Sequence, residues 1–483
     1  MEPILTPIQM AEADQRTIAA GTPVEVLMQR AGHAVAWEVR RRLGTTYGKR
    51  VVVVAGKGNN GGDGLIAAEV LRAWGIRVDV FELEHGVPES GFRSALGRAD
   101  LLVDGMFGTG FRGELEGDAA LVARHSTDVP TVAVDIPSGV DGLTGAVAGE
   151  AVRAVATVTF AARKTGLVFE PGRTLAGDVV VADIGLDLAA DRMALGLLEE
   201  SDVRAWLPTV LGEMHKWRSG LLVIGGSGGM TGAPMMASRA AMRAGAGIVW
   251  CAMPGHEAAT AASGAEVITK EMPATDGALS GVADAVRDAL DRFKAVAIGP
   301  GLGTADATTK VVRELATAVP APLVLDADGL NAFAGRAEAL RDRSAPTVLT
   351  PHAGEYERLF GEPVGDDRVS AARALADVTD CVVLLKGPGT VIAESSRTAP
   401  GRVAVNRLDG PWLGTAGTGD VLTGIIGAFL ARGGSAGGGV DAWEAAAAGA
   451  FVHGLAAEVA GHTGLVAGDL VAALPRALSQ VST

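Results

Sequence analysis

The feature that most constrains this sequence is a short apolar run that leads straight into a glycine-rich loop and then into a helical pattern. Residues 51–55, Val-Val-Val-Val-Ala, precede the loop 56–64, Gly-Lys-Gly-Asn-Asn-Gly-Gly-Asp-Gly, and a helix is expected over 65–74. A β-branched run without polar alternation is typical of a strand buried on both faces of a parallel sheet. Strand, glycine turn and helix in succession predict an α/β fold that binds ligands at the carboxyl ends of its strands.

The same alternation continues through the first half of the chain. Helices are expected within 8–43, and further strands are expected at 77–81, 101–104, 131–135 and 156–160. Asp104 and Asp135 come at the ends of two of these strands, and polar loops follow both. A lone aspartate in such a place is more often a helix cap or a turn residue. Together with the glycine loop 56–64, the loops after Asp104 and Asp135 place three sets of side-chain oxygens at one sheet edge. This arrangement favours a cation or ligand site instead.

The length of 483 residues is too great for a single ordinary core, so two domains are expected. The structural signal weakens between 184 and 208, and we place the boundary near 200–210, giving domains 1–205 and 206–483. A second strand and glycine loop begin at 220, but nothing after them keeps the register of the first half. The sequence therefore predicts two different α/β domains without a low-complexity linker between them.

Composition excludes several classes of partner. The apolar content of 48% with 20% charged residues indicates a soluble globular chain, and the net charge of −14 argues against nucleic acid or an anionic membrane surface. A phosphate-bearing ligand must then be held by backbone amides and helix ends. Two cysteines, Cys251 and Cys381, indicate a reducing compartment. Because there is neither a basic leader nor an apolar run of about 18 residues, we expect a cytoplasmic protein.

In the second half, polar motifs follow the expected strands one after another. Strands are expected at 248–251, 295–298, 322–325, 347–349 and 382–385, and the motifs are GPGLG at 299–303, DADGLN at 326–331, TPHAGE at 350–355 and KGPGT at 386–390. Any one of these could be an ordinary turn between a strand and a helix. Together with the glycine-rich stretch 414–424 they make five polar loops at one sheet edge, which favours a binding site.

The stretch 414–424, GTAGTGDVLTG, changes abruptly into the apolar run 425–430, which indicates a loop that enters a buried helix. Asp420 is expected near the N-terminus of that helix, where unpaired backbone N–H groups and the helix dipole form a seat for a phosphate. A carboxylate there can accept a proton from a hydroxyl that attacks the phosphoryl group. The alternative is an N-cap aspartate on a core helix.

Three motifs of the first half, GNNGGDG at 58–64, D-G-x-F-G-T-G at 104–110 and VDIPSGVDG at 134–142, together resemble the epimerase domain of the NAD(P)HX repair enzymes over about residues 1–200. The resemblance implies a Rossmann-like three-layer domain that interconverts the R and S forms of hydrated NADH and NADPH. It also implies a potassium ion held by Asn60, Asp104 and Ser138. The residues implied to hold the hydrate are Asn59, Asn60, Gly61, Gly62, Asp63, Gly108, Thr109, Gly110, Phe111, Arg112, Gly113, Glu114 and Asp135.

Asp135 is the candidate catalytic base of this first domain. C6 of the hydrate carries both a hydroxyl group and the ring nitrogen. Acid–base catalysis at the hydroxyl, assisted by the lone pair of the nitrogen, therefore lets water leave from one face of the ring and add again on the other. Lys164, in the sequence FAARKTG at 160–166, is expected to supply charge nearby or else to be a surface lysine.

The motifs of the second half resemble, in order, the ADP- or ATP-dependent NAD(P)H-hydrate dehydratases of the ribokinase-like superfamily, over about residues 205–480. Two departures are Ala353, where the family usually shows proline, and Gly329, where alanine is common; both concern loop geometry more than chemistry. The residues implied to contact the hydrate are Ala233, Gly303, His352 and Asp420. Those implied to contact the nucleotide are Lys386, Gly387, Pro388, Gly389, Thr390 and Gly419.

The second resemblance implies that Asp420 accepts the proton of the hydrate hydroxyl while that hydroxyl attacks the terminal phosphoryl group of ADP. AMP leaves first, and elimination of phosphate then restores the dihydropyridine ring. Mg²⁺ is expected with ADP. Glu355 is expected to help place the metal or else to be an exposed loop residue, and His352 to donate a hydrogen bond to the ligand or else to be a satisfied core residue.

Two other functions stay open at this point. The second domain could be a ribokinase-like kinase of a small alcohol, and the first could be a scaffold for RNA or protein assembly, although Asp135 argues against a scaffold. The alanine-rich segment 441–461, which carries Glu444, His453 and Glu458, is expected to be a packed helix pair rather than a site. The expected partners are the small molecules NADHX, NADPHX and ADP, together with further copies of the chain in a homo-oligomer.

Overall fold

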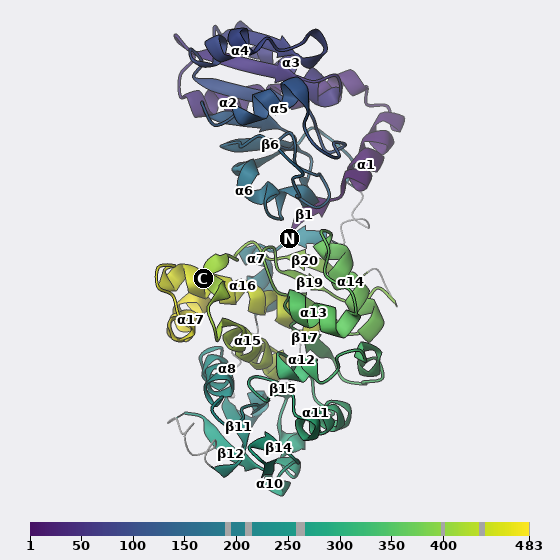
Figure 1. Cartoon of the computed structure of the whole chain (residues 1–483), viewed down its shortest axis with the longest axis vertical. Coiled ribbons are helices and arrows are strands. Elements are labelled where there is room, and N and C mark those ends of the chain that lie inside the picture. The colour runs from purple at the N-terminus through teal and green to yellow at the C-terminus, as the bar shows by residue number, and fades with distance from the viewer. Residues whose placement is uncertain (189–194, 208–214, 257–265, 398–400, 434–439, 483) are drawn as a thin grey trace. The chain divides into compact units, whose positions relative to one another are not determined.

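The computed structural model describes residues 1–188, 195–207, 215–256, 266–397, 401–433 and 440–482. The chain divides into two compact units (Figure 1), the first spanning Glu2–Gly196 and the second Leu197–Thr483 together with Met1. β9 (Leu195–Leu197) contains the point of division. The boundary expected between residues 205 and 206 falls inside α7 (Glu200–Trp206), which belongs to the second unit.

The first unit contains a six-stranded parallel sheet with the strand order β3-β2-β4-β5-β6-β8. Its strands are β2 (Arg50–Ala55), β3 (Arg77–Glu82), β4 (Leu101–Gly105), β5 (Thr131–Val134), β6 (Ala156–Phe160) and β8 (Asp178–Ala182), and the short strands β1 (Glu2–Leu5) and β7 (Arg163–Lys164) pair with each other. Strand order reverses between β2 and β4, and ligands of open parallel sheets bind at such a point.

Helices cover both faces of this sheet, as the period of two along a strand requires. Val51 and Val53 face a core that includes α2 and α3, whereas Val52 and Val54 face a core that includes α4 and α5. The helices are α1 (Pro7–Ala19), α2 (Val24–Leu43), α3 (Asn59–Ala73), α4 (Glu89–Leu96), α5 (Gly117–Arg124) and α6 (Gly172–Ala176), with 3₁₀ turns η1 (Leu83–His85) and η2 (Thr165–Leu167). The unit is the expected Rossmann-like three-layer fold.

The expected start of the helix after β2 is wrong. α3 begins at Asn59, so most of the motif predicted as a loop forms the first two turns of the helix. The glycines serve close packing rather than turns, because a Cβ at Gly61 would lie 1.8 Å from the carbonyl oxygen of Gly56 and one at Gly62 would lie 2.2 Å from the methyl carbon of Met28. Gly61 therefore lets α3 start directly against the end of β2, and Gly62 lets it pack closely against α2.

The second unit contains a larger sheet in the order β12-β11-β10-β15-β16-β17-β18-β19-β20. Its strands are β10 (Gly220–Ile224), β11 (Ile248–Pro254), β12 (Ile268–Met272), β15 (Ala295–Ile298), β16 (Leu323–Leu325), β17 (Thr347–Leu349), β18 (Val382–Leu385), β19 (Val391–Ala393) and β20 (Val403–Val405), and β13 (Ala274–Thr275) and β14 (Ala278–Leu279) form a small hairpin. The strands from β12 to β18 are parallel, so the expected loops do open on one edge.

The helices of the second unit form layers on either side of its sheet. They are α7, α8 (Gly232–Arg243), α10 (Asp284–Arg287), α11 (Asp306–Ala318), α12 (Asp328–Asn331), α13 (Ala353–Phe360), α14 (Arg368–Thr379), α15 (Thr418–Gly433), α16 (Ala442–Ala460) and α17 (Ala467–Ser482), with 3₁₀ turns η4 (Lys216–Ser219), η5 (Leu290–Arg292), η6 (Ala337–Leu340) and η7 (Pro411–Gly414). α8, α15, α16 and α17 share one core with the central strands, and Figure 1 shows α11 and α14 on the other side. Within the described residues, every helix is too short or too polar to cross a bilayer.

Candidate active sites

A cleft of about 510 Å³ opens in the first unit beside the carboxyl ends of β2 and β4, where the strand order reverses. Eight of the predicted hydrate residues line it, namely Asn59, Asn60, Asp63, Gly108, Thr109, Gly110, Phe111 and Asp135. Gly61, Gly62, Arg112, Gly113 and Glu114 are not among the lining residues. Arg112 turns to the backbone of Thr109 and to Asp141 instead. Only part of the predicted set of hydrate residues therefore lines the cleft, and the others contact the rest of the fold.

Asp135 and Lys164 form a buried ion pair in this cleft. Asp135 follows β5 with a positive φ of 65°, a conformation that turns its carboxylate out of the strand direction. The Lys164 Nζ lies 2.7 Å from the Asp135 Oδ1, and the two side chains are 2% and 13% exposed. Thr159 donates to the same Oδ1. The alternative of a surface lysine is thus wrong, because Lys164 is buried in the wall of the cleft beside Asp135.

Two more carboxyl groups face the same cleft. Asp63, in the second turn of α3, is 6% exposed, and its Oδ1 is buried without a hydrogen-bond partner among the described residues. Burial, with added repulsion from Asp135 and Asp14, raises the pKa of Asp63 to about 8. Burial also raises the pKa of Asp14, an effect that Lys164 opposes and Asp135 reinforces. Asp63 is therefore a neutral acid at pH 7.

Asp14 was not identified from the sequence. It lies on α1 between Met10 and Ile18, and all three line the cleft. Their spacing of four residues puts them on one face of the helix. A carboxylate in the middle of an apolar helical stripe was the available signal, but nothing in the sequence shows which surface that stripe covers.

The predicted potassium ligands Asn60, Asp104 and Ser138 come together beside the cleft. The Ser138 hydroxyl donates to the Asp104 Oδ1 over 2.7 Å, and the Asn60 amide donates to the backbone oxygens of Phe107 and Val134. Asp104 is 0% exposed, and burial raises its pKa to about 6 although hydrogen bonds from Ser138 and Met106 oppose the shift. Those donors are all neutral, so a cation would supply the missing positive charge.

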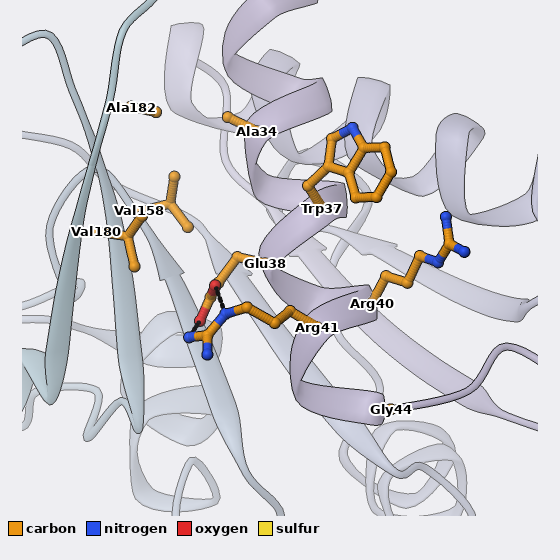
Figure 2. A pocket seen from close by; sticks show the side chains of 9 residues that line it. All are labelled: Ala34, Trp37, Glu38, Arg40, Arg41, Gly44, Val158, Val180 and Ala182. Atoms are coloured by element: carbon orange, nitrogen blue, oxygen red, sulfur yellow. Dashed lines mark hydrogen bonds and ion pairs between the residues drawn. The ribbon is translucent and has the colours of Figure 1, made fainter.

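A second cavity of the first unit, about 540 Å³ in volume, lies between α2 and the strands β6 and β8 (Figure 2). None of the predicted site residues lines it. Glu38 is only 5% exposed there and accepts hydrogen bonds from Arg41 and Arg42. The two cavities are of similar volume, but the buried carboxylate of this one is already paired with Arg41 and Arg42, so the cleft with Asp63 and Asp135 is the better candidate site.

In the second unit, the loops after β16, β17 and β18 meet at an ion pair. The Lys386 Nζ lies 2.9 Å from the Asp326 Oδ1 and 3.7 Å from the Glu355 Oε2. Thr350 and Thr423 also donate to Asp326. Burial disfavours the Asp326 carboxylate, but Lys386 and these hydroxyls outweigh it and hold the pKa of Asp326 below its usual value. Residues far apart in the sequence thus share one polar centre.

Asp420 lies in the first turn of α15, as expected, and belongs to the same centre. A Cβ added to the preceding Gly419 would lie 3.5 Å from the Lys386 Nζ. Burial, and then repulsion from Asp326, raises the pKa of Asp420 to about 7, while Lys386 opposes the shift. Asp326 is therefore the permanent anion beside Lys386, and Asp420 is the carboxylate that can exchange a proton near neutral pH.

His352 is a helix cap rather than a core residue. Its Nδ1 accepts hydrogen bonds from the backbone amides of Gly354 and Glu355 at the start of α13, and the Glu355 side chain accepts one from the His352 amide. The side chain is 54% exposed, whereas that of Glu355 is 6% exposed. The exposed-glutamate alternative is wrong. Because Nδ1 accepts, Nε2 is the ring nitrogen that can donate, and it lies 3.5 Å from the Glu355 Oε1 at the exposed side of the loop.

The predicted nucleotide loop, Lys386, Gly387, Pro388, Gly389 and Thr390, is held from two sides. The Asp409 carboxylate accepts from the amides of Gly389 and Thr390 over 2.7 and 3.0 Å. Arg368 donates to the backbone oxygens of Lys386 and Gly389. Gly387 and Gly389 have φ values of 139° and 71°, a region that side chains disfavour. The loop is thus fixed before any ligand binds.

The other predicted hydrate residues lie at the strand-order reversal between β10 and β15. A Cβ at Gly301 would lie 3.4 Å from that of Ala233, and the Gly303 amide donates to the Asp328 Oδ2 over 2.8 Å. Asp328 is two residues from Asp326, and Ala327 between them has a positive φ of 47°. This strained turn connects the Ala233 and Gly303 end with the Lys386 end.

The expected helix pair over 441–461 is wrong, because the segment forms the single helix α16, and its His453 packs beside the predicted site. It is 7% exposed, and its Nε2 has no hydrogen-bond partner within the described part of the chain. Burial and the charge of Lys386 lower its pKa to about 4, against a hydrogen bond with the backbone of Thr418. The imidazole is therefore neutral at pH 7 and lies beside the first turn of α15. The described residues contain no group of three or more His, Cys, Asp or Glu side chains placed to hold a metal.

Known proteins resemble the chain over its whole length. A family model described as NAD(P)H-hydrate dehydratase matches residues 221–478, and one described as YjeF-related protein N-terminus matches residues 24–91 and 83–166. Proteins named bifunctional NAD(P)H-hydrate repair enzyme Nnr are 40% identical in Salinibacter ruber, over 99% of this chain and 96% of the relative, and 40% identical in Moorella thermoacetica, over 94% and 92%.

The fold of the second unit also has a solved counterpart. A ribokinase-like superfamily protein from Enterococcus faecalis matches 60% of this chain and 97% of its own, with a TM-score of 0.50 and 20% identity. This likeness confirms the expected ribokinase-like fold. Together with the two family models and the full-length relatives, it establishes that the chain belongs to the family of bifunctional NAD(P)H-hydrate repair enzymes.

Proposed function

We propose that this chain repairs hydrated nicotinamide cofactors in two steps. The first unit epimerises the R and S forms of NADHX and NADPHX, and the second dehydrates the S form to NADH or NADPH with ADP as the phosphoryl donor. The observation that carries the proposal is the placement of Asp420 in the first turn of α15, beside Lys386 and with its pKa raised to about 7.

The dehydration step follows from this placement. The Asp420 carboxylate accepts the proton of the C6 hydroxyl while its oxygen attacks the terminal phosphorus of ADP, and AMP leaves as that phosphorus–oxygen bond breaks. Amides at the start of α15 and the Lys386 ammonium would hold the transferred group. Phosphate is a better leaving group than hydroxide. Elimination of phosphate from C6 together with a proton from C5 then restores the ring double bond.

Mg²⁺ is the expected companion of the nucleotide. Carboxylate oxygens of Asp326 and Glu355 lie beside Lys386 in the second unit, and these are the residues that would hold a hard cation. When bound, the metal would neutralise phosphate charge. The residues of the chain itself supply the base, the lysine and the fixed loop 386–390.

The epimerisation step is assigned to the cleft of the first unit, with Asp135 as the base. A potassium ion held by Asn60, Asp104 and Ser138 would neutralise the buried Asp104 carboxylate and keep the loop at Phe107 in place, because the Phe107 amide donates to the Ser138 hydroxyl. Replacing K⁺ by tetramethylammonium in the assay should slow the R-to-S conversion and leave S-hydrate turnover unchanged.

The decisive experiment incubates the purified chain with S-NADHX, ADP and Mg²⁺ and follows the absorbance of the dihydropyridine ring. Recovery of that absorbance with equimolar AMP and phosphate supports the proposal. Accumulation of a phosphorylated alcohol without elimination supports a ribokinase-like kinase instead. Parallel reactions with ATP and with S-NADPHX determine which nucleotide and which hydrate react faster.

A further inference from the structure

We propose that Asp63 is a catalytic residue of the epimerisation, the acid that gives its proton to the hydroxyl leaving C6 on one ring face while Asp135 takes a proton from the water adding on the other. This inference rests on the proposed epimerase function and adds to it the identity of the acid.

The first support is an unpaired oxygen. The Oδ1 of Asp63 is buried without a hydrogen-bond partner in the described part of the chain, although the residue lines the cleft. Buried side-chain oxygens are nearly always paired, because an unpaired one has lost its water without compensation. A hydroxyl of a ligand in the cleft would supply the missing partner. Asp63 is thus built to contact a ligand rather than to stabilise the empty fold.

The second support is the contrast between two carboxyl groups in one cleft. Asp135 lies 2.7 Å from the Lys164 ammonium and accepts a hydrogen bond from Thr159, two contacts that stabilise a carboxylate. Asp63, in contrast, has no basic group among the causes that shift its pKa, and its Oδ1 has no hydrogen-bond partner within the described residues. Two titratable groups whose surroundings favour opposite protonation states are the usual arrangement of an acid and a base.

The charges that surround Asp63 reinforce this contrast. The other titratable groups that line the cleft are Asp14 from α1, Lys57 before α3, Asp135 after β5 and Lys164 from β7. Burial comes first among the causes, followed by Asp135 and Asp14, and together they raise the pKa of Asp63 to about 8. Neither Lys57 nor Lys164 is among the groups that shift the pKa of Asp63. Asp63 therefore carries its proton at pH 7 and can donate it.

The step balances as follows. The C6–oxygen bond breaks, the Asp63 proton goes to the leaving oxygen to form water, and the ring-nitrogen lone pair becomes the C6–nitrogen double bond. A second water then attacks C6 from the opposite face and gives a proton to Asp135 as the new C6–oxygen bond forms. Asp63 ends as a carboxylate and Asp135 as an acid. The reverse epimerisation, or proton exchange with solvent, restores both.

The test compares Asp63→Asn with the unchanged chain, using the second unit as an internal control. With R-NADHX, ADP and Mg²⁺, NADH forms only after epimerisation, whereas S-NADHX tests dehydration alone. Asp63→Asn should lower R-hydrate turnover by about 10²–10⁴-fold, the usual loss for a missing acid, and leave S-hydrate turnover unchanged. R-hydrate turnover within threefold of the unchanged chain would overturn the assignment. If the unchanged chain fails to convert R-NADHX, the proposed epimerase function fails instead.

Two further measurements do not depend on the folding of that variant. In H₂¹⁸O the unchanged chain should place solvent oxygen on C6 in every epimerised molecule, and retention of the original oxygen would overturn the water-loss step. Asp14→Asn removes a charge that raises the pKa of Asp63. It should move the alkaline limb of the R-hydrate profile to lower pH, and an unmoved limb contradicts Asp63 as the acid.

Discussion

The Lys386 ammonium lies 2.9 Å from the carboxylate of Asp326, and this pair joins the ends of β16 and β18 across the end of β17. Thr350, which follows β17, donates to the same Asp326 oxygen. The ion pair with Lys386 keeps Asp326 ionised. Together with burial, which is the larger cause, the negative charge of Asp326 then raises the pKa of Asp420. Asp326 therefore positions Lys386 and raises the pKa of Asp420, and each of these two roles can be measured.

Asp420→Asn should remove the base of the dehydration step. We expect kcat with S-NADHX and ADP to fall by about 10²–10⁴-fold, because asparagine keeps the shape of the side chain but cannot accept the proton. Steady-state kinetics of dihydropyridine formation measure the loss. Conversion of the R to the S hydrate in the same preparation serves as the control, and residual kcat within threefold would exclude Asp420 as the base.

The pH dependence of dehydration should show an acid limb. A base must be ionised to work, so with a pKa of about 7 for Asp420 the rate should be full above that pH and fall as the pH drops through it. Asp326→Asn removes a charge that raises this pKa and frees Lys386, which lowers it. Both effects move the limb to lower pH in kcat/KM profiles. A limb that stays in place contradicts the coupling between Asp326 and Asp420.

Asp135→Asn should abolish the R-to-S conversion and leave S-hydrate turnover intact. The amide keeps its hydrogen bond with Thr159 but cannot take a proton from water. Chiral separation of the two hydrates after incubation without ADP measures the epimerisation directly. Unchanged epimerisation in this variant would favour a binding scaffold over an enzyme for the first unit.

Lys164→Met should destabilise the first unit by about 3 kcal/mol, the lower end of the range for breaking a buried pair, because it leaves the Asp135 charge without its partner. Hydrogen exchange in β5 and β6, followed by mass spectrometry, reports on this unit alone. Lys57→Met is the matched control, since Lys57 is 84% exposed in its pair with Glu84. Its effect should stay below about 1 kcal/mol, and equal effects would contradict the buried pair.

His352 should show separable effects on stability and binding. His352→Ala loses the cap of α13 and should cost about 1 kcal/mol, whereas His352→Asn can still accept from the Gly354 and Glu355 amides. Both variants lose the Nε2 donor, so both should raise KM for the S hydrate. Hydrogen exchange in α13 and steady-state kinetics distinguish the roles. An unchanged KM in both variants would show that His352 only caps α13 and does not bind the hydrate.

The local elements could be predicted because their signals are local. The strands β6, β15 and β17 have the predicted bounds, since a short β-branched run between turn residues is favourable only as a strand. The parallel order then brings Asp326, Glu355 and Lys386 to one edge, as the repeated pattern of strand and polar loop implies. The start of α3 at Asn59 was mispredicted, because glycine disfavours helices and tertiary packing against Gly56 overrides that preference.

The sequence by itself determined two α/β folds, the loops that carry the chemistry and the candidates Asp135 and Asp420, since periodicity and turn residues act over a few positions. The tertiary structure alone decided that Lys164 is buried against Asp135, that Asp14 from α1 lines the cleft, and that the Oδ1 of Asp63 has no hydrogen-bond partner among the described residues. Protonation states depend on which distant side chains exclude water from a carboxyl group, and no local pattern records that.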